Sequence, residues 1–245
     1  MNEPQDIDHI LKKWEFDPFG MNVRRVQTKT RSVLQMRIEM GLLQLEIEGR
    51  PDGSKPHGYD TYLDYLIAAE KEWPDDYHFS EDECIQIDRE FVQYYHRRIC
   101  WLQLKEFRCV VADADHTLNL MDISKRYSPD EGWTMSHEQY RPFVLYHRTQ
   151  AAALHLIDND RDPEIAIEEI NLGLQCIRDV FESFGAGEHF ERDELPNRLI
   201  EFREDLRQRY KVGQTLEEKL KQAIADEQYE QAAKLRDQLA KRNSL

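Results

Sequence analysis

The sequence TLEEKLKQAIADEQYEQAAKLRDQLAKR, from Thr215 to Arg242, predicts two short amphipathic helices joined by a polar corner. Its apolar residues recur at three- and four-residue spacing, which places them on one face of a helix. They are Leu216, Leu220, Ala223 and Ile224 in the first helix, and Tyr229, Ala232, Ala233, Leu239 and Ala240 in the second. Thr215 can cap the first helix, with acidic residues in its first turn. We therefore predict an α-hairpin here.

The second helix of this hairpin carries a recognisable motif. Residues Tyr229–Leu239 follow the pattern aromatic-Glu-x-Ala-Ala-x-x-Arg-Asp-x-aliphatic, which closely resembles the UVR motif. That motif is an α-hairpin of UvrB and UvrC in bacterial nucleotide excision repair, and of McsA-type activators of a protein arginine kinase. An ordinary alanine-rich amphipathic helix would reproduce the apolar spacing without the Arg-Asp pair. The resemblance implies a protein-binding module with no catalytic role.

By the same resemblance, the hairpin pairs with a UvrB/UvrC-like hairpin of another protein, or with a second copy of this chain. We expect apolar side chains to make the contact by burial, and Arg236 with Asp237 to contribute by pairing or capping. The predicted contact residues are Leu216, Leu220, Ile224, Tyr229, Ala232, Ala233, Arg236, Asp237 and Leu239.

Composition limits the possible functions of the chain. Its 245 residues suffice for one large or two small domains with a sizeable core. The 48 acidic residues exceed the 33 basic ones, giving a formal charge of −15. Nucleic-acid affinity depends on Lys and Arg, so this balance argues against a broad phosphate-binding surface but leaves a local basic patch open. The low Gly and Pro content favours helix.

Hydropathy and cysteine usage predict a cytoplasmic protein. The sequence has no N-terminal apolar run typical of a signal peptide, and no stretch near the roughly 20 apolar residues of a membrane span. We expect reduced, buried thiols because the four cysteines form no CxxC pair; a metal or disulfide role is the alternative. They are Cys84, Cys100, Cys109 and Cys176.

We predict an all-α fold: a helical body resembling tetratricopeptide (TPR) repeats, followed by the UVR-like hairpin. Residues 1–22 are expected to form an irregular strap whose aromatic side chains dock on the body. The body spans residues 23–190, a connecting helix and hinge spans 191–213, and the hairpin spans 214–245.

Two helices are expected at the start of the body. Val26–Glu48 carries apolar residues at helical spacing and stops at the breaker cluster Gly49–Gly53. A second helical pattern covers Tyr59–Glu72. Together they predict an αα-hairpin.

The TPR resemblance rests on two longer helix pairs. A capping box at Ser80 and Glu83 starts a helix that runs to Leu104, and a second helix follows it. The tripeptide Tyr95-His96-Arg97 recurs as Tyr146-His147-Arg148, with a loop expected over residues 125–136 between the copies. Lys105 departs from the family by standing where glycine is usual. These features predict a short helical solenoid, with an ordinary helical bundle as the alternative.

The first helices of TPR-like repeats line a peptide-binding groove. Arginine and aromatic side chains there can clamp a carboxylate or a phosphate. The alternative is that the tyrosines pack in the core and the arginines reach solvent along it. The candidate groove residues are Tyr95, Arg97, Arg98, Tyr146 and Arg148.

No catalytic motif accompanies the hairpin. The sequence lacks phosphate-binding glycine loops, HExxH, GxSxG and a paired Cys/His framework. Asp113, Asp115 and His116 are the sharpest metal candidates, but only Asp113 and His116 share a helix face. We expect a solvated face there, with no metal and no cofactor. Basic residues at 24, 25, 29 and 31 are likewise expected on a solvated helix face, nucleic-acid contact being the alternative.

These observations predict a non-catalytic adaptor that binds another protein and neither catalyses a reaction nor enters a membrane. The resemblance links it to nucleotide excision repair. One alternative is a repair accessory that touches DNA directly. Another is a regulator of a kinase or stress system like McsA, although the scattered cysteines do not supply the Cys-rich metal-binding segments of that class.

Overall fold

The computed structural model describes residues 6–242, and the chain divides into two compact units. One unit ends at Val144 and the other begins at Leu145. The described residues form ten α-helices and one three-stranded sheet, so the fold is mainly helical, as predicted. None of the helices in this range is both long enough and apolar enough to cross a membrane.

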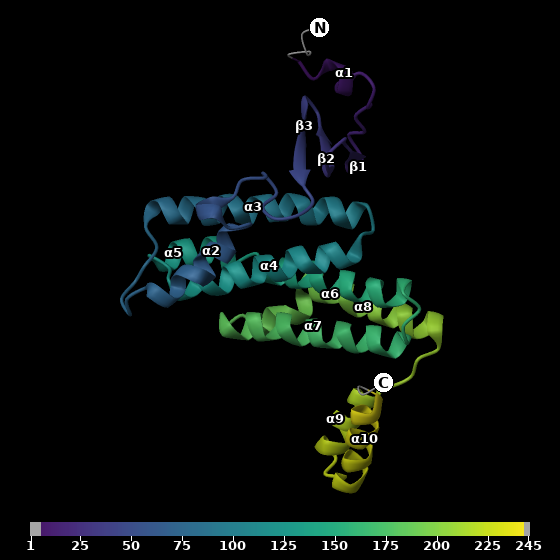
Figure 1. The fold of residues 1–245 in the computed structure, drawn as a ribbon. Helices are drawn as coiled ribbons and strands as arrows, with labels where there is room; N and C mark the ends of the chain where they lie inside the picture. The colour runs from purple at the N-terminus through teal and green to yellow at the C-terminus, as the bar shows by residue number, and fades with distance from the viewer. Residues whose placement is uncertain (1–5, 243–245) are drawn as a thin grey trace. The chain divides into compact units, whose positions relative to one another are not determined.

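The first unit opens with a short helix and an antiparallel sheet (Figure 1). Helix α1 (Asp8–Leu11) precedes three strands that pair in the order β1-β2-β3. The strands are β1 (Asn22–Gln27), β2 (Ser32–Ile38) and β3 (Gly41–Glu46). The predicted helix over Val26–Glu48 is therefore wrong, and so is the αα-hairpin that it was expected to start.

The chain reverses direction twice within this segment, which a single helix cannot do. The Thr28 hydroxyl accepts a hydrogen bond from the Arg31 N–H at 3.0 Å and closes the turn between β1 and β2. In β2 the residues from Val33 to Arg37 form a continuous buried run, which includes the polar Gln35, so burial does not alternate along the strand. A short run of that kind fits a helix and a strand equally well, which explains the wrong prediction.

Aromatic side chains of the N-terminal segment contact the sheet. The guanidinium of Arg24 lies 4.0 Å from the ring centre of Trp14, and that of Arg37 lies 5.7 Å from Phe16. Phe19, by contrast, is 98% exposed, so the expected docking does not extend to it. Residues 1–5 of the predicted strap lie outside the described range.

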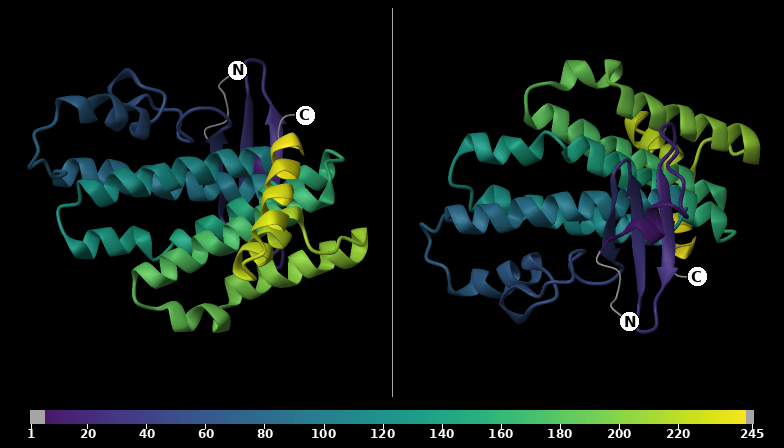
Figure 2. Two further views of the ribbon diagram at one scale, coloured as in Figure 1. Left: turned by 90° about the horizontal axis from the view of Figure 1, so that it is seen from below. Right: turned by 90° about the horizontal axis from the view of Figure 1, so that it is seen from above.

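Two long antiparallel helices form the centre of the first unit. Helix α2 (Tyr62–Ala69) leads to α3 (Glu81–Gln103) and α4 (Phe107–Arg126), which lie side by side in every view (Figures 1 and 2). The predicted capping box is confirmed: the Ser80 N–H donates to Glu83 Oε2 at 2.8 Å. Lys105 joins the two helices with a left-handed φ of 58°, the conformation that glycine adopts most easily.

The segment expected as a loop over residues 125–136 contains helix α5 (Glu131–Glu138). Asp130 caps it by accepting a hydrogen bond from the Trp133 N–H at 2.8 Å. Trp133 lies at the margin of the main apolar core of this unit, whose other aromatic members include Trp73, Phe79 and Tyr127. The helix therefore forms with its apolar side against a core contributed by distant segments.

The second unit contains three long helices and a hairpin. Helices α6 (Arg141–Asp158), α7 (Pro163–Ser183) and α8 (Glu194–Tyr210) share an apolar core, with a 3₁₀ segment at Gly187–Arg192. α6 begins in the last residues of the first unit. Gly173 lets α6 and α7 approach closely, because a Cβ atom there would lie 2.6 Å from Thr149 Cβ.

Helices α9 (Leu216–Ala225) and α10 (Tyr229–Arg242) form the predicted hairpin and lie side by side (Figure 1). The cap at Thr215 is confirmed: its N–H donates to Glu218 Oε2 at 2.9 Å, and its hydroxyl accepts from the Glu218 N–H at 3.2 Å. Glu227 turns the corner with a φ of 57°.

The TPR resemblance stays a prediction. The pairs α3–α4 and α6–α7 are both helical hairpins, as a repeat would require. The matching tyrosines differ, however, because Tyr95 is exposed whereas Tyr146 is buried.

Candidate functional site: the C-terminal hairpin

The inner face of the hairpin is its own small core. Ala223, Ala232 and Leu235 are buried there. Leu216 and Leu220 pack against this core. Three of the residues predicted to contact a partner therefore face the other helix of the hairpin instead: Leu216, Leu220 and Ala232. A fourth, Leu239, is buried as well.

The outer face carries the remaining predicted contact residues. Tyr229, Ala233, Arg236 and Asp237 are exposed along one side of α10, at the spacing of successive helical turns; we call them the outer stripe. Tyr229 is 69% exposed, and Ile224 on α9 is 53% exposed. The hairpin therefore presents an aromatic and an aliphatic side chain that its own core does not use.

Arg236 and Asp237 form a loose, open pair. Arg236 Nη2 lies 3.4 Å from Asp237 Oδ1, and both side chains are largely exposed. Exposed pairs of this kind contribute little to folding stability, so both groups stay available to a partner.

The base of the hairpin is held by Glu218. Its carboxylate accepts hydrogen bonds from the Thr215 N–H and from Asn171 Nδ2 at 2.8 Å, and it also pairs with Arg207. Burial alone would raise the pKa of Glu218, but these hydrogen bonds and the charge of Arg207 together hold it below its ordinary value. The Glu218 side chain is thus ionised at neutral pH and ties α9 to α7 and α8.

The end of α10 is held to α7 by a second set of charges. Arg242 pairs with Glu168, and its Nη1 lies 3.6 Å from Glu164. Glu164 also accepts a hydrogen bond from the Leu216 N–H at the start of α9. Burial raises the pKa of Glu168, against the opposing effect of Arg242. Sequence reasoning missed these contacts because their partners lie dozens of positions apart and share no local pattern.

The matched motif covers this hairpin and its cap. Residues 214–241 match the family model of the UvrB/uvrC motif. Comparisons with curated proteins and with solved structures gave no match. The predicted UVR resemblance is therefore confirmed for these residues, and we call them the UVR hairpin. The UVR motif occurs in nucleotide excision repair proteins and mediates protein interactions, which supports a role in repair or in interaction.

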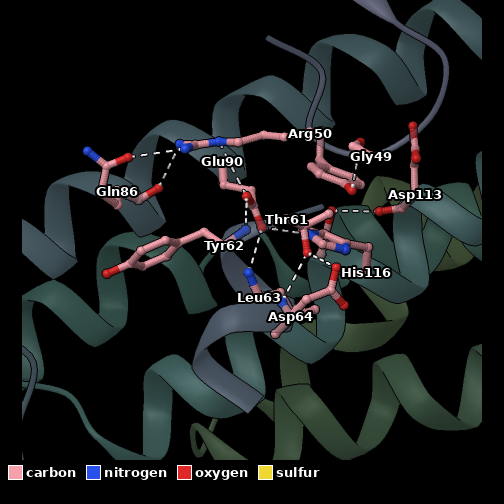
Figure 3. Close-up of polar contacts among 12 residues, drawn as sticks. Gly49, Arg50, Thr61, Tyr62, Leu63, Asp64, Gln86, Glu90, Asp113 and His116 are labelled. Atoms are coloured by element: carbon pink, nitrogen blue, oxygen red, sulfur yellow. Dashed lines mark hydrogen bonds and ion pairs between the residues drawn. The ribbon is translucent and has the colours of Figure 1, made fainter. Parts of the chain in front are cut away.

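A buried polar network in the first unit contains the residues that looked most like metal ligands (Figure 3). Glu90 has no solvent exposure and accepts hydrogen bonds from the N–H groups of Tyr62, at 2.6 Å, and Leu63, at 3.0 Å. His116 Nε2 lies 2.9 Å from Glu90 Oε1, and Arg50 Nε lies 3.4 Å from Glu90 Oε2. The network joins the start of α2 to α3 and α4, which is a structural role.

Asp113 belongs to the same region but serves a different arginine. Arg97 donates from Nε to Asp113 Oδ2 at 2.9 Å and from Nη2 to Oδ1 at 2.7 Å. His116 stacks on Tyr94, with ring centres 3.6 Å apart. The expected solvated face at Asp113 and His116 is therefore wrong. No group of three or more His, Cys, Asp or Glu side chains suited to a metal ion occurs within residues 6–242.

The candidate groove residues do not share one surface. Arg97 is buried and turned toward the sheet, where Nη1 donates to the Gly49 carbonyl at 2.7 Å. Tyr146 is buried in the core of the second unit, and Arg148 pairs with Glu169 at 2.8 Å. Tyr95 and Arg98 do line a common cleft in the first unit. The alternative expectation is that the tyrosines pack in the core and the arginines reach solvent. It holds for the buried Tyr146 and fails for Arg98, whose side chain is buried as well.

The basic residues near the N-terminus lie in the sheet region. The basic residues at 24, 25, 29 and 31 lie on β1 and the following turn, so the expected helix face is wrong.

All four cysteines are free, with Cys84 and Cys100 buried and the other two partly exposed. Burial raises the pKa of Cys84 to about 11 and that of Cys100 to about 12, so both stay protonated thiols at neutral pH.

Proposed function

We propose that this protein is a non-catalytic adaptor that acts in the cytoplasm and binds another protein through the outer stripe of its UVR hairpin. The observation that carries the proposal is the exposed Tyr229. The hairpin completes its core without this side chain, so folding gives no reason for a large aromatic group there. Exposed aromatic and arginine side chains are the usual anchors of protein interfaces, and the stripe offers one of each.

The partner that the motif favours is another hairpin of the same kind. Ile224 and Tyr229 supply apolar surface, and Arg236 with Asp237 supplies one charge of each sign. A hairpin with the same pattern can pair with both charges while covering both apolar groups. The description of the matched motif supports a partner from the UvrB or UvrC class, and thereby a link to nucleotide excision repair. Self-association through the same stripe is the other form of this pairing.

The test is a double substitution in the full chain, Tyr229→Asp with Ala233→Asp. Binding to purified UvrB and UvrC is measured by biolayer interferometry, and self-association by analytical ultracentrifugation. We expect the wild-type chain to bind a partner or itself, and the double variant to lose at least about tenfold in affinity, which is about 1.4 kcal/mol.

The matched control is Gln231→Asp with Gln238→Asp. Both glutamines are exposed on α10 away from the outer stripe, and the change in charge is the same. The control should bind as the wild type does. Equal binding by the double variant and the wild type, or no binding of the wild type to any of these partners, would overturn the proposal.

A further inference from the structure

The first unit contains an apolar cleft that the UVR hairpin does not explain. Its volume is about 770 Å³, and it lies between α3, α5 and the first turn of α6. Phe91, Val92 and Tyr95 line it from α3, and Tyr140 and Val144 line it from the opposite side. Val92, Tyr95 and Tyr140 are partly exposed, so the cleft is open to solvent. Its volume falls in the range of small-molecule sites.

Arg98 lines this cleft with an uncompensated positive charge. The residue is only 1% exposed, and its one hydrogen bond among the described residues runs from Nη1 to Thr117 Oγ1 at 2.9 Å. Its Nε is buried and has no hydrogen-bond partner there. Asp113, the carboxylate whose charge acts on Arg98, gives both oxygens to Arg97. Arg98 is therefore a buried cation without a paired anion.

A buried charge without a partner costs free energy, and a bound anion would reduce this cost. Burial lowers the pKa of Arg98 to about 10, despite the opposing effect of Asp113. The guanidinium still carries its charge at neutral pH. Buried charges in proteins are normally paired and hydrogen-bonded. An anion at the Arg98 end of the cleft would supply the negative charge that this guanidinium lacks.

The far end of the cleft has no free charge. Asp88 Oδ1 accepts from Trp133 Nε1 at 3.2 Å and lies 2.9 Å from His137 Nε2, so this carboxylate is already engaged. Asp88 and Arg98 are ten positions apart on α3, which places them about 15 Å apart along the helix axis. An anionic head group at Arg98 is therefore well separated from Asp88, and apolar surface lies between them.

We propose that this cleft binds a small amphipathic carboxylate, with its carboxylate on Arg98 and its apolar body against Phe91, Val92 and Tyr95. A planar carboxylate matches the planar guanidinium fork. The single negative charge of a carboxylate balances the single positive charge of Arg98. A phosphate monoester with two negative charges would leave one of them unbalanced close to the negatively charged Asp113. This site is independent of the proposed adaptor function.

The first test compares head groups on one apolar tail. Binding of decanoate, decanol and decyl phosphate to the full chain is measured by isothermal titration calorimetry. We expect saturable binding of decanoate, and at least about tenfold weaker binding of the other two. Absence of decanoate binding, or decanol binding as tightly, would overturn the proposal. Tighter binding of decyl phosphate would overturn the carboxylate assignment.

The second test uses variants of the cleft. Arg98→Gln should weaken decanoate binding at least about tenfold, and Val92→Asp should weaken it as much by placing a negative charge at the exposed rim. Val92 is half-exposed, so Val92→Asp should fold. This variant tests the site even if Arg98→Gln does not fold. Arg89→Gln, an exposed arginine of the same helix outside the cleft, is the control. Unchanged binding in Val92→Asp, or an equal loss in Arg89→Gln, would contradict the assignment.

Discussion

Glu90 holds three segments of the first unit together with a single carboxylate. It accepts from two N–H groups at the start of α2 and faces both Arg50 and His116, all without exposure to solvent. The N-terminus of a helix favours negative charge, so the start of α2 and Arg50 are both suited to a carboxylate at this position. Removing one member of such a buried set leaves the others without compensation.

Glu90→Gln should therefore destabilise the first unit by about 3 kcal/mol, the usual cost of breaking a buried ion pair. The amide cannot accept from both N–H groups, and Arg50 loses its buried partner. Urea unfolding followed by circular dichroism measures the change. Glu81→Gln, an exposed residue at the start of the same helix, is the matched control and should be nearly neutral. A loss below about 1 kcal/mol would show that Glu90 matters less than its contacts indicate.

Glu218 gives a prediction for pH. Its folded-state pKa lies below the ordinary value, so the stabilisation that it provides is complete above the unfolded-state pKa of about 4.3. That stabilisation is lost as the pH falls through the lower, folded-state pKa. The difference in melting temperature between wild type and Glu218→Gln should therefore be largest near neutral pH and should shrink below about pH 4. A difference that grows on acidification would contradict the assigned direction.

At the scale of elements, local signals predicted the helices well. Ser80 and Thr215 each cap the start of a helix, as the sequence predicts. These signals act within one helical turn, so a single sequence contains them. The sheet could not be predicted in this way, because the run Val33–Ile38 becomes a strand only when β1 and β3 pair with it.

The sequence identifies the residues of the candidate site, but it does not tell which way their side chains face. The motif residues are all in the hairpin, yet the spacing does not tell which face each helix turns to the other. Ala232 and Ala233 are neighbours in the motif, and the structure buries the first and exposes the second. The contacts of Arg242 with α7 and the surroundings of Arg98 depend on residues far apart in the sequence, which no local pattern reveals.

The close approach of α6 and α7 can be tested at Gly173. A methyl group there would overlap the buried side chain of Thr149, and a rotamer change would not relieve the overlap because Thr149 Cβ itself lies within 2.6 Å. Gly173→Ala should therefore cost about 1–3 kcal/mol, as overpacking of a core usually does. The control is Gly213→Ala, because a Cβ at Gly213 meets no atom within 4 Å. Thermal unfolding measures both variants, and equal melting temperatures would contradict the close packing.

At the scale of the whole molecule, the charge argues against direct DNA binding, the alternative to the proposed adaptor function. The formal charge is −15. Two of the clustered arginines are engaged within the sheet region: Arg24 donates to Gln35 at 2.7 Å, and Arg31 to Glu46 at 2.8 Å. Glu46 offsets the charge of Arg31, and the hydrogen bond to Gln35 occupies a donor of Arg24 that a phosphate would otherwise use.

We expect no change in fluorescence anisotropy when the full chain is added to labelled single- or double-stranded DNA at low salt. Low ionic strength strengthens phosphate contacts, so it is the most favourable condition for binding. A signal that disappears on raising the salt would instead support the DNA-contacting alternative. Buffer at matched ionic strength without protein serves as the reference.

The position of the tryptophans has a spectroscopic consequence. Trp14 beside Arg24, and Trp73 and Trp133 at the aromatic core, all belong to the first unit, as does Trp101. Indole emission therefore reports the first unit alone, whereas far-ultraviolet dichroism reports the helices of both. Recording the two signals in one denaturant titration separates the unfolding of the two units without a label. The UVR hairpin contains Tyr229 but no tryptophan, so it contributes nothing to the indole emission.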